Sequence, residues 1–111
     1  MKIAVALIEN KPAFHFGKAN DFKIVSIEND KINASYDVHD TDHVHQARPQ
    51  YLKDLGCTVL LCNGVGSGAM ERLTDLGIEV YGFNNLSVDD ALQSLIAGRL
   101  PQVTDIFECI C

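Results

Sequence analysis

The sequence lacks the features that mark several common functional classes. No apolar run approaches the roughly 20 residues that a membrane-spanning helix requires. The 9 Lys and Arg residues, set against 15 Asp and Glu, form no basic stripe or tail, so the attraction to phosphates that nucleic-acid binding needs is missing. Internal repeats are absent too, which excludes a repeat architecture. We therefore expect neither membrane insertion nor nucleic-acid binding, and a single domain for 111 residues.

A convincing signal peptide is also missing. The first apolar stretch, residues 1–8, is short and has no small-residue cleavage site, so it is interpreted as a strand. We expect a cytoplasmic protein, in which four cysteines are more often thiols or metal ligands than disulfides. Four histidines complete the supply of soft donors: His15, His39, His43 and His45.

Hydropathy patterning predicts one α/β domain at 1–100 and a C-terminal tail at 101–111. The expected order, β-β-β-α-β-α-β-α, gives a mixed five-stranded sheet between helical layers, a three-layer α/β/α fold. Pro49 fits only a first helical turn, and Gly98 is an expected helix stop. Strands are expected at 2–8, 22–27, 32–38, 58–62 and 78–82, and helices from 45–48 to about 55, at 67–75 and at 88–97.

One edge of this sheet should collect the polar donors. If the fourth strand is parallel to the first, the loops 9–17 and 39–46, the turn 62–69 and residues 82–84 all follow strands that end at the same edge. Ligands of open α/β sheets bind at the carboxyl ends of the strands. The sequence therefore predicts a ligand site at this carboxyl edge.

A glycine-rich turn at this edge is the expected anion-binding group. It links an apolar strand to a helix N-terminus, where backbone N–H groups and the helix dipole favour an anion. The Lys-Ser/Thr pair of a P-loop is absent, and Asn84 and Asn85 stand where a dinucleotide site would have an acidic residue. The turn is therefore interpreted as a general anion cradle. Its residues are Gly64, Val65, Gly66, Ser67 and Gly68.

Six side chains are candidate metal ligands: His15, His43, His45, Cys62, Cys109 and Cys111. A structural role is the alternative for each. The histidines could be solvated or packed loop residues, and Cys62 could be a buried strand residue, although an adjacent helix N-terminus favours a thiolate. The two tail cysteines would project to one side of an extended chain and suit one soft metal ion. The alternative for the tail is an added edge strand built on Val103, Ile106 and Ile110.

Two further residues receive less weight. Cys57 precedes the strand that Cys62 ends, about 16 Å away at the rise of a β-strand, too far to share a metal ion or a disulfide. It is interpreted as structural. His39 can finish the third strand and face either way, and Asp40 and Asp42 can orient the loop histidines.

Several segments match a known family in order and with compatible spacing. They are His15-Phe16-Gly17-Lys18-Ala19, the histidine-bearing loop at 39–45, Gly64-Val65-Gly66 before a helix, and the segments at 76–81 and 88–92. With these segments, residues 1–100 resemble the dinitrogenase iron–molybdenum cofactor biosynthesis family. The resemblance implies an RNase H-like fold without RNase H activity. It also implies binding, storage or delivery of anionic metal–sulfur clusters, by members that include nitrogenase accessory factors and carriers of iron–sulfur or molybdenum–copper sulfide clusters.

We therefore expect a small carrier of an anionic metal–sulfur cluster, of the iron–molybdenum cofactor or iron–sulfur type, rather than an enzyme. The dispersed carboxylates form no convincing catalytic set. The expected partners are cluster donor and acceptor proteins, and a homo-oligomer is left open. The alternatives are a phosphate- or nucleotide-binding α/β module that uses the glycine turn, and an oligomeric scaffold without metal.

Overall fold

A computed structural model describes residues 1–8, 11–12, 21–39, 47–62, 67–82, 87–99 and 102–103. Its five main strands are those predicted: β1 Lys2–Ile8, β3 Asp21–Glu28, β4 Lys31–His39, β5 Val59–Leu61 and β6 Glu79–Tyr81. The helices are α1 Ala47–Asp54, α2 Ser67–Asp75 and α3 Val88–Ile96, again as expected. None of the described helices is long and apolar enough to span a bilayer.

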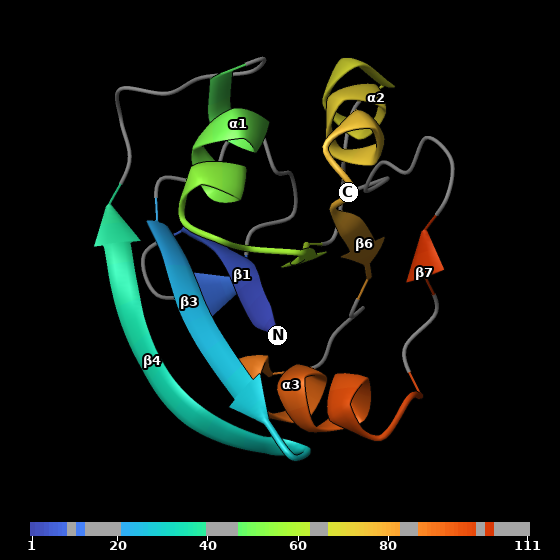
Figure 1. Ribbon diagram of the computed structural model, residues 1–111. Helices are drawn as coiled ribbons and strands as arrows, with labels where there is room; N and C mark the ends of the chain where they lie inside the picture. Colours follow the sequence, from blue (N-terminus) through green and yellow to red (C-terminus); the bar gives the residue numbers. More distant parts are fainter. Residues whose placement is uncertain are drawn as a thin grey trace.

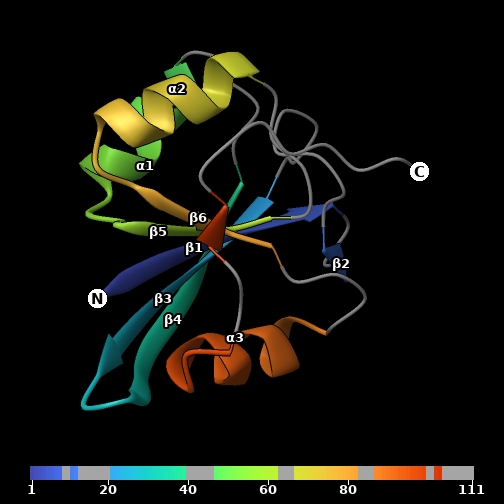
Figure 2. The ribbon, with the colours of Figure 1, turned by 90° about the vertical axis from the view of Figure 1, so that its right-hand side faces the viewer.

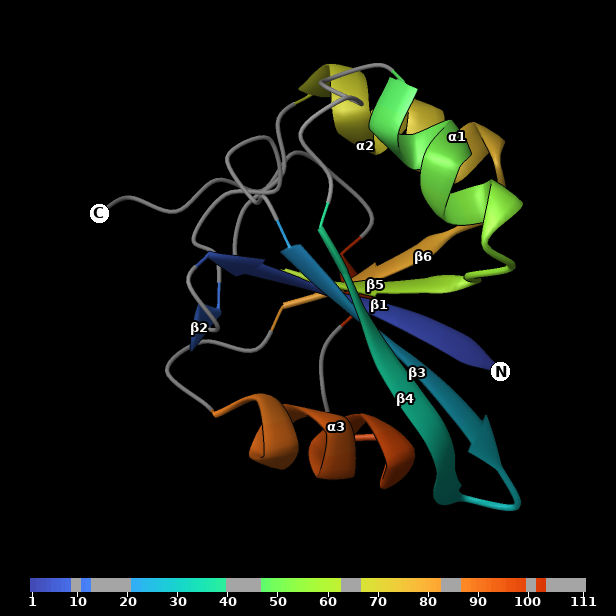
Figure 3. The same ribbon diagram turned by 90° about the vertical axis from the view of Figure 1, so that its left-hand side faces the viewer.

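The strands form one mixed sheet in the order β4-β3-β1-β5-β6-β7 (Figure 1). β3 is antiparallel to both β1 and β4, whereas β5 is parallel to β1 and β6 is parallel to β5. The helices α1 and α2 cover one face of the sheet and α3 covers the other (Figures 2 and 3). This is the predicted three-layer α/β/α arrangement.

Two very short strands extend the predicted sheet. β2, Lys11–Pro12, folds back on the end of β1, and β7, Gln102–Val103, pairs antiparallel with β6. Residues 9–17 were expected to form a loop and residues 101–111 a tail, and the alternative for the tail was an added edge strand that includes Val103, which β7 matches at Gln102–Val103. A two-residue strand leaves no periodic pattern, because its pairing depends on the unpaired backbone groups of its neighbour rather than on its own side chains.

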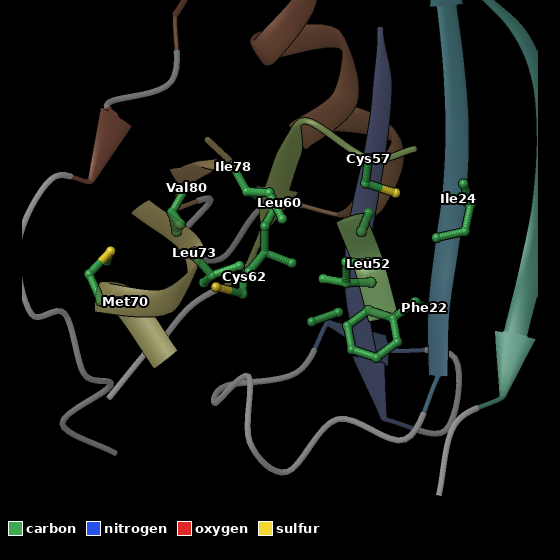
Figure 4. Close-up of a cluster of buried hydrophobic side chains, with 12 residues drawn as sticks. Phe22, Ile24, Leu52, Cys57, Leu60, Cys62, Met70, Leu73, Ile78 and Val80 are labelled. Atoms are coloured by element: carbon green, nitrogen blue, oxygen red, sulfur yellow. The ribbon is translucent and has the colours of Figure 1, made fainter. Parts of the chain in front are cut away.

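The core has two parts, one on each face of the sheet. β1 shows how they are divided, because its side chains alternate between the faces. Ala4 and Ala6 belong to the part beneath α1 and α2, and Ile3, Val5 and Leu7 to the part above α3. The larger β1 side chains thus face the single helix. The alanines leave room for larger side chains from α1 and α2 on the other face (Figure 4).

The helices begin and end at residue types that are typical of helix caps and helix stops. The Ser87 hydroxyl accepts a hydrogen bond from the Asp90 backbone N–H at 3.1 Å, which caps α3. α1 is followed by Gly56 and α3 by Gly98, with φ angles of 89° and 73°. This left-handed backbone favours glycine, so the chain can turn sharply from each helix toward the next segment.

Candidate functional site

Four strands end at the same edge of the sheet. Because β4 is antiparallel to β3 and β3 is antiparallel to β1, β4 runs in the same direction as β1, β5 and β6. Their last residues, Ile8, His39, Leu61 and Tyr81, therefore mark one carboxyl edge, where β3 begins at Asp21. The segments predicted to carry the ligands leave the sheet from these strand ends.

The N-terminus of α2 belongs to this edge. Ser67 and Gly68, two of the predicted anion-binding residues, are its first two residues. The first N–H groups of a helix have no partner within it and carry the positive end of its dipole. The first turn of α2 contains no acidic side chain, whereas that of α3 contains Asp89 and Asp90. Gly64, Val65 and Gly66 lie outside the described residues.

Cys62 directly follows β5 and is fully buried. It belongs to the core part beneath α1 and α2, near Leu60, Met70 and Leu73 (Figure 4). Its backbone N–H donates to the Tyr81 carbonyl oxygen at 3.2 Å. The structure thus places this side chain in the apolar core, the alternative considered above, and its role as a metal ligand stays a prediction.

Cys57 is equally buried, at the opposite end of β5 from Cys62 (Figure 4). Burial raises the pKa of the Cys57 thiol, and the nearby Lys2 ammonium lowers it to a smaller extent. A protonated thiol among apolar side chains fits the structural role predicted for this residue.

The other predicted ligands, His15, His43, His45, Cys109 and Cys111, lie outside the described residues. Within the described part of the chain, no three His, Cys, Asp or Glu side chains are grouped as metal ligands would be. The assignment of these five residues to a metal therefore stays a prediction.

His39 is the first feature of the edge that sequence reasoning undervalued. It is the last residue of β4, directly opposite Asp21 of β3, and its Nδ1 lies 2.6 Å from the Asp21 Oδ1. On the same face, Lys23 pairs with Asp37 at 3.4 Å. Only the register of the two strands reveals the His39–Asp21 pair. One sequence signal was available, since His39 and His43 have a spacing that zinc ligands use.

Arg48 is the second such feature. Its side chain is only 2% exposed, and it is the one buried polar or charged residue among those described. The guanidinium carbon lies 5.4 Å from the centre of the Phe22 ring, within the range of a cation–π contact. Phe22 is the second residue of β3, next to the carboxyl edge. A permanent positive charge is therefore fixed close to that edge, in a chain with a net charge of -6.

Comparisons with known proteins agree with this architecture. An uncharacterised protein of Methanocaldococcus jannaschii is 29% identical over 105 residues, which cover 90% of this chain and 89% of that protein. The apo form of the orange protein from Desulfovibrio gigas superposes with a TM-score of 0.78 at 26% identity, covering 96% of each chain. A second Methanocaldococcus jannaschii protein, provisionally described as a dinitrogenase, shares the fold at a TM-score of 0.81 and 18% identity, covering 95% of this chain and 96% of that one.

A family model extends the agreement from fold to sequence. The model described as dinitrogenase iron-molybdenum cofactor matches residues 1–98. The match spans the sheet up to β6 and all three helices, and it includes every strand end at the carboxyl edge. The chain belongs to the dinitrogenase iron-molybdenum cofactor family.

Proposed function

We propose that the protein is a carrier, with no catalytic activity of its own, for an anionic metal–sulfur cluster of the iron–molybdenum cofactor or iron–sulfur type. The cluster is its cargo, received from a donor protein and passed to an acceptor protein. Family membership links the chain to iron–molybdenum cofactor binding or biosynthesis. The similar orange protein was solved in an apo form, a term that implies a loaded counterpart.

The observation that carries the proposal is the acid-free N-terminus of α2 at the carboxyl edge. Sulfide ligands of a cluster are hydrogen-bond acceptors with negative charge, so unpaired backbone N–H groups suit them. In the proposal the cradle from Gly64 to Gly68 binds these sulfides. Arg48 adds a fixed positive charge on the same face of the sheet, which favours an anionic cargo.

Side chains from the adjoining segments complete the proposed site. His15, His43 and His45 ligate metal atoms of the cargo, and Cys109 and Cys111 close over it. Cys62 is a proposed ligand as well, and its burial means that ligation requires its side chain to leave the core. Imidazole binds metal only when neutral, so loading should weaken as the pH falls below the histidine range.

Cluster loading of protein prepared without oxygen tests the proposal. The full chain would be incubated with tetrathiomolybdate, or with ferrous iron and sulfide, and then passed over a desalting column. We expect charge-transfer absorption and metal to elute with the protein. The double variant His15→Ala/His43→Ala should lose most of this metal, while His39→Ala, a matched histidine control outside the proposed ligand set, should retain it.

Two outcomes would contradict the carrier. One is a colourless protein that retains no metal, and the other is loading that the double variant does not change. Thermal stabilisation by nucleotides or inorganic phosphate, without cluster loading, would instead support the phosphate-binding alternative.

A further inference from the structure

We draw no further inference here: the strongest candidate, the N-terminus of α1 at the carboxyl edge with the buried Arg48 in its first turn, belongs to the cargo site already proposed.

Discussion

The buried guanidinium of Arg48 is stabilised by its surroundings rather than by water. A charge taken out of water costs several kcal/mol unless partners compensate for the lost hydration. The Phe22 ring provides one such contact, with the guanidinium carbon 5.4 Å from the ring centre. Planar, weakly hydrated guanidinium groups stack on aromatic rings better than ammonium groups do. The contact therefore ties the first turn of α1 to β3.

A double-mutant cycle should measure this contact. Arg48→Met and Phe22→Leu keep apolar volume at both positions while removing the charge and the ring, respectively. We expect a coupling of about 0.5–2 kcal/mol in the free energy of unfolding, the range of a desolvated cation–π contact. Urea denaturation of the four proteins gives the value. Strictly additive effects would show that the two groups are neighbours without an energetic interaction.

Burial of Cys57 predicts a loss of stability at alkaline pH. Burial raises the pKa of this thiol above its ordinary value, so the folded state retains the proton at pH values where the unfolded chain releases it. The stabilising contribution is complete below about pH 9 and is lost as the pH rises through the folded-state pKa. The urea midpoint should therefore fall as the pH is raised above 9.

Cys57→Ala is the control for this effect. At neutral pH it should cost about 1 kcal/mol for the lost packing. The gap to the natural chain should narrow as the pH rises, because the variant has no thiol to ionise. A gap that stays constant up to pH 10 would mean that Cys57 does not contribute. The raised pKa of Tyr81 acts in the same direction in both proteins and cancels in the comparison.

The roles of individual side chains could be predicted from the sequence only where they depend on residues nearby in the chain. Gly98 was predicted as a helix stop because the end of a helix depends on the backbone of one residue and its neighbours in the chain. Arg48 contacts Phe22, and His39 pairs with Asp21. Both contacts join residues that are distant in the sequence, so no local pattern predicts them. Whether Cys62 faces the ligand or the core depends on the register of its strand, because a shift of one residue moves a side chain to the other face.

The main helices and strands were predictable because buried positions produce a recognisable pattern of apolar residues in the sequence. β1 is covered on both faces and has a continuous apolar run, whereas β3 alternates between the two core parts after its polar start. The carboxyl edge followed from the strand order and from parallel pairing of β5 with β1. The positions of the strand ends could thus be foreseen, while the contacts made there could not.

β4 is an edge strand with an interruption. Eight of its nine residues are exposed, and only Val38 is half-buried. Its register against β3 shifts between Ser26, paired with Ala34, and Ile27, paired with Ile32, so Asn33 is an extra residue in β4. A bulge twists an edge and discourages pairing with another chain. Exposed Ile32 and Tyr36 are also placed on opposite faces by the extra residue, which divides the apolar surface.

Deletion of Asn33 should therefore promote self-association. The shortened strand can pair regularly with β3 and presents a flat edge of unpaired backbone groups. We expect a concentration-dependent dimer or larger species in sedimentation velocity, with the natural chain sedimenting as a smaller species at the same concentration. Asn33→Ser, which keeps the extra residue, should behave like the natural chain. Equal sedimentation of the deletion and this control would show that the bulge does not protect the edge.

The proposed site for an anionic cargo lies at one edge of a molecule whose own net charge is negative, so the two repel each other at long range. The chain has a net charge of -6 and a radius of gyration of 12.4 Å. At 0.01 M salt the Debye length is about 30 Å, so the whole molecule repels an approaching anion, whereas at 0.15 M it is about 8 Å and only nearby charges act. Charges and dipoles close to the edge, such as the dipole of α2, then make up a larger share of the field that the anion meets.

Added salt should consequently speed cargo capture. We expect the association rate constant for tetrathiomolybdate, followed by stopped-flow absorbance, to rise between 0.01 M and 0.15 M salt because the long-range repulsion is screened. Arg48→Met should bind more slowly at both salt concentrations, and the difference should be smaller at 0.15 M, where screening weakens the contribution of every charge. A rate that falls steadily with salt in the natural chain would mean that local positive charge governs the encounter at every distance. The net acidity of the chain would then have no part in selecting its cargo.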